Sequence, residues 1–443
     1  MLTNKIAKHF IVIIFASLFA GITGCKKDLQ PVTAEQPDNK IKHAEAKTGI
    51  SLATLFRNSY QVYELQRNAK GVYRDSKLFS GTDYHPCSVA NIGMGLVSLC
   101  IADKMSWITN AGQLARTTLQ TVLGYDTTFH LAKNVAGFPR HFVDMQTGVQ
   151  AWNSEFSTID AAIMVSGALF CKKYFASDTT ISRLADTLYN SINWSKAIAD
   201  PVAGTMYLSL DSMGNGLSTT SVYNEYMLVA NLAYNAENGA GGNATTLWNN
   251  FFVNPDNMPK SNYWGYSLLT DYPGSFLSDF IPQFCYYLCH PYNTGTRYLT
   301  YMNNSMLADK KWWTFTSGLG AYEWGLGAGS APSGYHADGE DNNPDKVVSP
   351  HIIAGFMPVN SASQNDLLSL YNANKGVYTL PGSTNKILWR YSVTSPSWTA
   401  NEVQGVDFSS MLFGLASLPA HCGTAFFTNN NDYIFPRYSF LPR

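Results

Sequence analysis

The feature that most restricts the fold of this chain is a repeated pairing of two kinds of predicted helix. One kind is apolar on every side, as in 161–170, which contains no charged residue. The other kind is amphipathic, as in 181–192, where isoleucine and leucine recur at helical spacing. A helix that is apolar all round must be buried, whereas an amphipathic helix covers a core with one face. The pairing therefore predicts an inner and an outer layer of helices.

Further pairs of the same kind occur along the chain. Six inner helices surrounded by six outer ones account for the number and the alternation, so the predicted fold class is all-α, an (α/α)6 toroid. The linkers at 200–222, 254–273 and 309–347 are long, and we expect these loops to carry function at one mouth of the barrel. The other pairs are 87–103 with 110–123, 221–235 with 243–253, 275–289 with 295–308, 348–356 with 363–374, and 51–69 with 405–417 across the closure of the ring.

The first 48 residues are expected to serve targeting and tethering. Lys5 and Lys8 precede an apolar run at 10–20, which is too short for a mature membrane-spanning helix and fits a secretory signal. The following Ile-Thr-Gly-Cys resembles a bacterial lipobox, in which Cys25 is acylated; an ordinary signal with an incidental cysteine is the alternative. This predicts a cell-envelope lipoprotein of the outer membrane, periplasmic or surface-exposed, held to the membrane by its lipid anchor alone. The expected parts are a signal peptide at 1–24, an acylated tether at 25–48 and one domain at 49–443.

Charge and aromatic content restrict the class of ligand. The 30 Lys and Arg residues nearly balance the 31 Asp and Glu residues, so there is no electrostatic case for nucleic acid as a partner. Charged residues make up only 14% of the chain, and aromatic residues make up another 14%. This combination favours a neutral polar ligand, such as an oligo- or polysaccharide.

Motifs for other chemistries are weak or missing. Neither a P-loop lysine motif nor a Gly-x-Ser-x-Gly elbow occurs in the sequence. Cys285 and Cys289, followed by His290, could face a metal, but no second ligand cluster accompanies them, and packing is the preferred interpretation. The acidic loop 338–345 could hold calcium but lacks the EF-hand spacing, so a solvated loop is preferred. We expect no metal and no cofactor.

Two stretches carry a resemblance to a known family. Residues 137–144 are Gly-Phe-Pro-Arg-His-Phe-Val-Asp, and residues 154–162 are Ser-Glu-Phe-Ser-Thr-Ile-Asp-Ala-Ala. They resemble the glucoamylase-like domain family that includes bacterial endo-β-1,2-glucanases. The chain departs from the family in Gly-Ala-Gly-Ser-Ala-Pro at 327–332, which lacks a loop acid, and in the last helix, where relatives often carry Asp-Gln-Gly. Further matches are 88–96, 184–194, Tyr-Asn-Glu at 223–225, Trp-Gly-Leu at 324–326, Gly-Tyr at 334–335, 348–355 and 405–407.

Glu225 is the candidate general acid. Hydrolysis of a glycosidic bond requires a protonated carboxyl for the leaving oxygen and a carboxylate that activates water or attacks the anomeric carbon. Glu225 is expected at the start of a buried helix between Tyr223 and Tyr226, an apolar setting that raises the pKa of a carboxyl. The family resemblance points to the same residue. The alternative is that Glu225 only caps its helix.

The second carboxylate has three candidates. Asp407 begins an apolar helix, where a buried carboxylate is costly without a task or a partner. The resemblance implies that it is a candidate base, acting through water or a sugar hydroxyl; the alternative is an ion pair with Arg390 or another basic residue. Glu155 and Asp160, at the start of another inner helix, are either the second carboxylate or residues that bind hydroxyls and cap the helix.

Side chains near these acids are expected to bind the sugar. Aromatic rings can stack on an apolar sugar face without any charge, and Arg140 and His141 either donate to sugar hydroxyls or satisfy Asp144. The candidate binding residues are Arg140, His141, Asp144, Trp152, Tyr223, Asn224, Trp264, Trp324 and Tyr335.

The resulting prediction is a glycoside hydrolase that cleaves a β-glucan with inversion, and the resemblance implies an endo-β-1,2-glucanase. A glycosidase of another linkage and a non-catalytic, glycan-binding surface lipoprotein are the alternatives. The missing loop acid favours the binding protein, whereas the retention of four candidate acids argues against it.

Overall fold

The computed structural model describes residues 50–317, 319 and 321–442. The predicted signal peptide, Cys25 and the tether therefore lie outside the described residues. The chain from Thr48 to Arg443 forms one compact unit. Within the described residues, none of the helices combines the length and the apolar character that a bilayer crossing requires.

Six helices form the inner layer of this mostly helical unit. In α2, every residue from Val89 to Ala102 is buried, which explains the absence of any polar face in the sequence. The helices contact one another in cyclic order, α2 with α4, then α6, α8, α11, α13 and back to α2. The inner helices are α2 (Val89–Lys104), α4 (Thr158–Tyr174), α6 (Met227–Ala236), α8 (Phe280–Leu288), α11 (Pro350–Gly355) and α13 (Gly405–Ala416).

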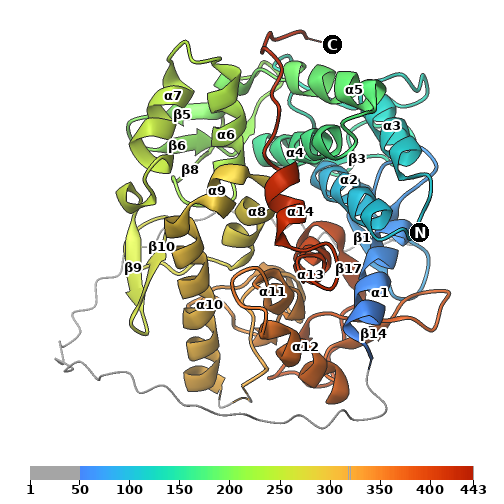
Figure 1. Ribbon diagram of the computed structural model, residues 1–443, viewed down its shortest axis with the longest axis vertical. Helices are drawn as coiled ribbons and strands as arrows, with labels where there is room; N and C mark the ends of the chain where they lie inside the picture. The colour runs from blue at the N-terminus through green and yellow to red at the C-terminus, as the bar shows by residue number, and fades with distance from the viewer. Residues whose placement is uncertain (1–49, 318, 320, 443) are drawn as a thin grey trace, which may run out of the picture. The chain divides into compact units, whose positions relative to one another are not determined.

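The outer helices cover this layer (Figure 1), as the amphipathic pattern predicts. α3 packs on α2, α5 on α4, α7 on α6 and α12 on α11, while α1 packs on α13 and so joins the two ends of the domain. α10 instead contacts the short helix α9 (His290–Thr294) and a neighbouring strand. The outer helices are α1 (Leu52–Gln66), α3 (Ala111–Val122), α5 (Thr179–Asn190), α7 (Asn243–Leu247) with the π-turn Trp248–Phe252, α10 (Thr296–Ser317) and α12 (Ser363–Asn372).

Glycines allow the backbones of inner helices to touch. A Cβ atom on Gly167 of α4 would lie 2.3 Å from the carbonyl oxygen of Gly93 in α2, and one on Gly93 would lie 2.1 Å from that of Ile163. A Cβ atom on Gly414 of α13 would likewise lie 2.0 Å from the carbonyl oxygen of Ala354 in α11. These distances are far below van der Waals contact, so the two helix pairs require residues without side chains at these points.

Short antiparallel strands precede four of the inner helices. β2 (Cys87–Ser88) pairs with β3 (Phe142–Val143) and leads into α2, and β4 (Phe156–Ser157) pairs with β7 (Ser209–Leu210) and leads into α4. In the same way, β13 pairs with β16 before α11, and β17 pairs with β1 before α13. The bounds are β13 (Val347–Val348), β16 (Tyr391–Ser392), β17 (Glu402–Gln404) and β1 (Ser76–Leu78).

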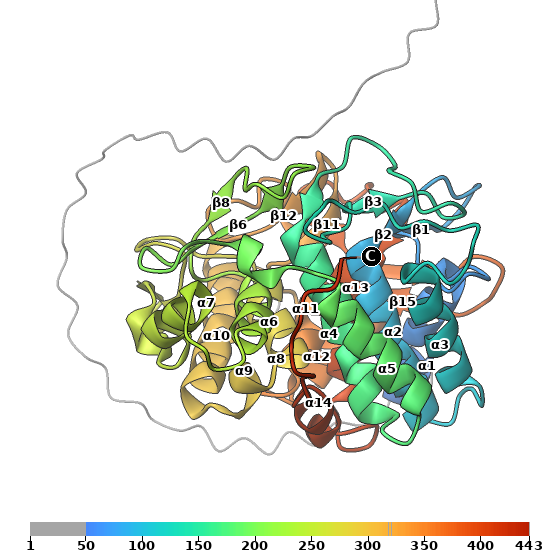
Figure 2. The same ribbon diagram turned by 90° about the horizontal axis from the view of Figure 1, so that it is seen from above.

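The three long linkers are only partly loops, which corrects the sequence expectation. α10 continues to Ser317, nine residues beyond the predicted end at 308, because the buried Trp312 and Trp313 extend its packing face. Figure 2 shows β1, β2, β3, β6, β8, β11 and β12 at one end of the helices and the short helix α14 (Thr424–Asn430) at the other. The strands not yet named are β5 (Ile198–Asp200), β6 (Thr205–Tyr207), β8 (Thr219–Thr220), β9 (Lys260–Tyr263), β10 (Tyr266–Leu269), β11 (Ala328–Ala331), β12 (Gly334–Ala337), β14 (Val377–Thr379) and β15 (Lys386–Leu388).

Candidate active site

The four candidate acids all lie where inner helices begin. Glu155 precedes β4, Asp160 is in the first turn of α4, Glu225 is in the turn before α6, and Asp407 is in the first turn of α13. Electrostatic interactions link these residues. The charge of Asp160 raises the pKa of both Glu225 and His141, and the charge of Asp75 raises the pKa of both His141 and Asp407. Residues from three helix starts and two strand pairs therefore form one electrostatic cluster.

His141 lies between two of these carboxylates. Its Nδ1 is 3.1 Å from Glu155 Oε1, and its Nε2 is 3.6 Å from Asp160 Oδ1. Burial alone would lower the pKa of His141, but the carboxylates of Asp160, Glu155 and Asp75 outweigh it and raise the pKa to about 9. The ring is therefore a cation near neutral pH, and its hydrogen bond helps to keep the pKa of Glu155 below its usual value despite burial.

The same three residues form the one compact group of metal-type ligands among the described residues. Ligand atoms of His141, Glu155 and Asp160 all lie within 4.8 Å of one another. A histidine ligand must be neutral to offer its lone pair, whereas His141 is held in its protonated form by these two acids. The distances from the ring nitrogens of His141 to the two carboxylates are those of an ion-pair cluster.

Glu225 stands without a cation. The residue as a whole is partly exposed, and its carboxyl group forms no hydrogen bond or ion pair with another side chain in the described part of the chain. Burial, reinforced by the nearby charge of Asp160, raises its pKa to about 7. Glu225 does not cap α6 through its side chain, because Tyr226 is the N-cap residue and no side-chain cap bond is present.

The turn that carries Glu225 is held by Asn224. The Asn224 amide donates to the carbonyl oxygen of Ser221 at 3.0 Å, and its Oδ1 accepts from the backbone N–H of Tyr226 at 2.9 Å. Asn224 is buried, and so is Tyr223. Both were predicted to bind substrate; the structure instead gives Asn224 a role in shaping the turn and Tyr223 a role in packing.

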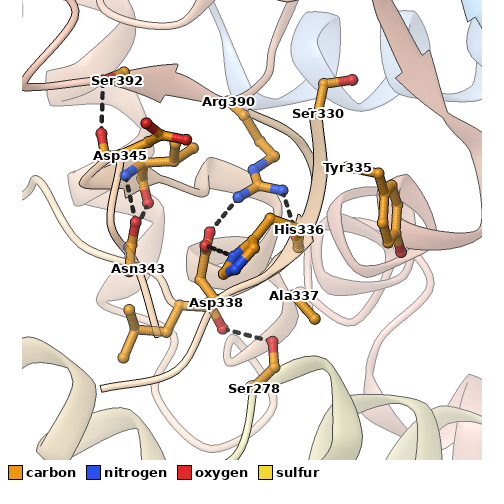
Figure 3. Close-up of polar contacts among 12 residues, drawn as sticks. Ser278, Ser330, Tyr335, His336, Ala337, Asp338, Asn343, Asp345, Arg390 and Ser392 are labelled. Carbon is orange, nitrogen blue, oxygen red and sulfur yellow. Dashed lines mark hydrogen bonds and ion pairs between the residues drawn. The ribbon is translucent and has the colours of Figure 1, made fainter. Parts of the chain in front are cut away.

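Asp407 is held by a tyrosine. The hydroxyl of Tyr335 lies 3.2 Å from both carboxylate oxygens of Asp407. Burial raises the pKa of Asp407 to about 7, although the positive charge of Arg390 acts in the opposite direction. The alternative of an ion pair between Asp407 and Arg390 is wrong, because the buried guanidinium of Arg390 pairs with Asp338. Figure 3 shows Asp338 joined to Arg390 and to His336, with Tyr335 outside this group.

The acidic loop at 338–345 is solvated only in part, because three of its eight residues are buried. Asp338 and Asn343 are buried, and Asp338 accepts from His336 Nδ1 at 2.7 Å in addition to its ion pair. Asn343 Oδ1 accepts from the backbone N–H of Val347 at 2.8 Å and closes the loop. The side-chain oxygens of Asp338 and Asn343 are therefore engaged within the protein.

Asp75 is a member of the cluster that the sequence analysis missed. It lies just before β1, and its carbonyl oxygen accepts from the backbone N–H of Gly405 at the start of α13, at 2.8 Å. Its carboxylate accepts from Ser76 Oγ at 3.0 Å, and burial raises its pKa despite the opposing charge of His141. No local pattern marks this residue, because its place depends on the pairing of β1 with β17.

Two other predicted binding residues have local structural roles. Arg140 donates to a backbone carbonyl and lies with its guanidinium 3.7 Å from the ring centre of Phe156. Asp144 accepts from the backbone N–H groups of Gln146 and Thr147 at 3.0 and 2.8 Å, which shapes its own turn. Neither His141 nor Arg140 pairs with Asp144.

The predicted aromatic residues divide into exposed and buried rings. Trp152, Trp264 and Tyr335 are about half exposed. Trp324 is only 1% exposed, and its Nε1 donates to Asp366 at 2.8 Å, so the prediction that it stacks on a sugar is corrected. Asp309 accepts from the backbone N–H groups of the two residues after Trp324, which draws this segment into the core.

Comparison with solved structures identifies the fold. The sequence matches no family model and no curated protein. The structure is nevertheless similar to two solved proteins described as putative glucoamylases, at 16% identity in each case. For the protein from Bacteroides fragilis the TM-score is 0.72, with 88% of this chain and 96% of that chain covered; for the protein from Bacteroides caccae the values are 0.71, 86% and 94%.

A third similar structure is an endo-β-1,2-glucanase from Chitinophaga pinensis, solved in complex with sophorotriose and glucose. The TM-score is 0.70 at 16% identity, with 86% of this chain and 95% of that chain covered. The glucoamylase-like domain predicted from the sequence is confirmed at the level of the fold.

Proposed function

We propose that this protein is a glycoside hydrolase with Glu225 as its general acid. The observation that carries the proposal is the state of Glu225: in a partly exposed residue, a carboxyl that pairs with no cation among the described residues and has a pKa raised to about 7 by burial, near the charge of Asp160. A carboxyl of this kind is still partly protonated near neutral pH and can donate to the leaving oxygen of a glycosidic bond.

Asp407 is the proposed base. Its carboxylate begins a different inner helix from the one that Glu225 precedes, and the Tyr335 hydroxyl orients it. We propose an inverting reaction, for which the two carboxyl groups stand roughly 6.5–9.5 Å apart with room for water. Glu155, which His141 keeps ionised, is the alternative base.

The proposed substrate is a neutral β-glucan, and a linear β-1,2-glucan is the most specific candidate. The acids of the cluster outnumber its cations, which disfavours sugars that carry a carboxylate. Two similar solved structures, from Chitinophaga pinensis and Talaromyces funiculosus, are endo-β-1,2-glucanases in complex with sophorotriose and with sophorose. We further propose that the cyclic contacts of the inner helices form an (α/α)6 toroid, and that acylated Cys25 holds the protein to the outer membrane.

The test is to incubate the purified protein with linear glucans of different linkage and to measure new reducing ends. Glu225→Gln keeps the shape of the side chain but removes the transferable proton, so turnover should fall by about two orders of magnitude or more. Substrate affinity should change little. NMR of the first-formed anomer tests inversion. Near-normal turnover of the variant would move the acid role away from Glu225, and retained configuration would exclude the proposed water-activating base.

A non-catalytic glycan-binding lipoprotein is the second candidate. It is favoured by one observation: the segment 327–332, which lacks the family's loop acid, contains strand β11, whose partner β12 carries Tyr335. Binding of a glucan without release of reducing ends would select this candidate.

A further inference from the structure

Two exposed aromatic rings lie beside the candidate active site. The exposed fraction is 70% for Tyr84 and 52% for Trp152. Tyr84 precedes β2, and Trp152 lies in the loop between β3 and β4, so both come from segments next to the starts of α2 and α4. Large rings left in water at this place offer apolar area that a ligand can bury.

Ring contacts connect this pair to His141. Trp152 meets Phe142 edge to face with ring centres 4.8 Å apart, and Phe142 stacks on His141 at 3.7 Å. On its other side, Trp152 meets His85 at 6.2 Å, and Tyr84 stacks on His85 at 4.1 Å. The two exposed rings are therefore held at a fixed distance from the acidic cluster.

His85 packs against both rings and supports them from the protein side. It is buried, and its Nε2 lies 2.9 Å from Glu402 Oε2. Glu402 also accepts from the Gln404 amide at 2.9 Å, which holds this carboxylate in β17. These contacts order the support beneath the rings and leave the outer faces of Tyr84 and Trp152 uncovered.

The backbone of Trp152 is held in an uncommon conformation. Its φ is 51°, in the left-handed region that bulky residues rarely adopt. The Gln150 amide donates to the carbonyl oxygen of Trp152 at 3.1 Å and helps to hold this turn. Strained residues of this kind concentrate at ligand sites, where the surrounding structure maintains them.

We propose that Tyr84 and Trp152 form a stacking subsite for a sugar unit of a neutral glucan chain, beyond the unit whose bond is cleaved. The inference rests on the proposed function for its substrate class. The rings bury the apolar faces of a sugar without requiring any charge. Glu402 beside Tyr84 would repel a sugar acid, which restricts the ligand to neutral units.

Binding measurements test the subsite independently of turnover. The full-length protein carrying Glu225→Gln is titrated calorimetrically with long linear glucans of several linkages, and the tightest is used. Tyr84→Ala and Trp152→Gly, each added to this background, should weaken binding about tenfold, which corresponds to ~1.4 kcal/mol. Glycine at position 152 suits the left-handed backbone, so loss of the ring is not confused with misfolding. Trp152→Phe should retain most of the affinity.

The matched control is Tyr125→Ala. Tyr125 is a half-exposed tyrosine that follows α3, and its hydroxyl accepts from Arg183 of α5; its removal should leave the affinity unchanged. In the protein with Glu225 intact, loss of either ring should raise KM about tenfold while kcat stays within about twofold, because the contact is the same in the ground and transition states.

The outcomes separate this inference from the proposed function. Weakened glucan binding in the ring variants, together with no release of reducing ends by the parent protein with Glu225 intact, would support the subsite and reject the hydrolase. Normal turnover with unchanged affinity and KM in both ring variants, or no measurable binding to any glucan, would overturn the subsite. A fall in kcat at constant KM would also overturn it, because the rings would then act on the chemical step.

Discussion

Glu225 and Asp407 are carboxyl groups that the fold keeps close to half-protonated at neutral pH. Burial raises the pKa of each to about 7, and neither forms an ion pair with any residue that the structure describes. A protonated acid and an ionised base are then needed together, so we expect activity to fall on both sides of a maximum near pH 7. The two apparent pKa values read from such a pH profile describe the pair of carboxyl groups together and are not assigned to single residues.

The raised pKa of Glu225 also predicts that the folded protein loses stability when this carboxyl ionises. Because the folded pKa of about 7 exceeds the unfolded value near ~4.3, the stabilising contribution is complete below about pH 4 and is lost as the pH rises through about 7. Glutamine resembles the neutral acid and does not ionise. We expect Glu225→Gln to unfold at a higher temperature than the parent at about pH 8 and at the same temperature at about pH 4. Equal melting temperatures at both pH values would contradict the raised pKa.

His141 should show a dependence of the same sign at higher pH. Its folded pKa of about 9 exceeds the unfolded value near ~6.5, so the ion pairs with Asp160 and Glu155 stabilise the fold fully below about pH 6.5 and are lost as the pH rises through about 9. Partial exposure of the ring reduces the effect. We expect His141→Gln to cost about 1–2 kcal/mol at pH 6 and little near pH 10, measured by urea unfolding. A cost that does not change with pH would mean that packing, not charge, holds His141.

The sequence marked the acids by residue type and motif, but it could not separate their roles. Glu225, Asp407, Glu155 and Asp160 lie at helix starts as predicted. Trp324 was misplaced, because a tryptophan beside a loop has the same sequence signature whether it is exposed or buried. Asp75 and Tyr84 were missed, because strand pairing and ring contacts between distant segments bring them to the site.

At the scale of the elements, the inner helices depend on backbone contact. A side chain on Gly167 would meet the backbone of α2, which cannot move aside without shifting the helix. We therefore expect Gly167→Ala to destabilise the domain by about 1–3 kcal/mol or more, although alanine favours helix formation. The control is Gly112→Ala in the outer helix α3, where the nearest atom is 3.7 Å away; it should stabilise by up to ~1 kcal/mol. Urea unfolding measures both, and a neutral Gly167→Ala would contradict the close contact.

Helices were predictable and strands were not, for a physical reason. The apolar run in α4 and the spaced apolar residues of α5 give a signal over many residues, and the Ser157 side chain caps α4 by accepting from the backbone N–H of Asp160 at 3.2 Å. β2 and β4 have two residues each, too few for any period. Their pairing is imposed by the helices that they join.

At the scale of the whole molecule, the contact of α1 with α13 closes the cycle of helices, and the pairing of β1 with β17 repeats the closure beside Asp75 and Asp407. The beginning and the end of the domain thus both contribute to the candidate site. A substitution that disturbs the pairing of β1 with β17 should therefore lower the catalytic activity. A chain of independent helical pairs would not show this effect.

Residues 1–47 precede the compact unit, which begins at Thr48 and has its own core. A chain that starts at Thr48 should therefore keep the melting temperature and the glucan turnover of the full protein. It should, however, leave the membrane fraction, because acyl groups on Cys25 are the proposed anchor. Cys25→Ser in the full chain should be released in the same way, as measured by fractionation and by labelling with a radioactive fatty acid. A Cys25→Ser protein that stays membrane-bound would reject the lipobox, and a shortened chain that fails to fold would show that the first segment belongs to the domain.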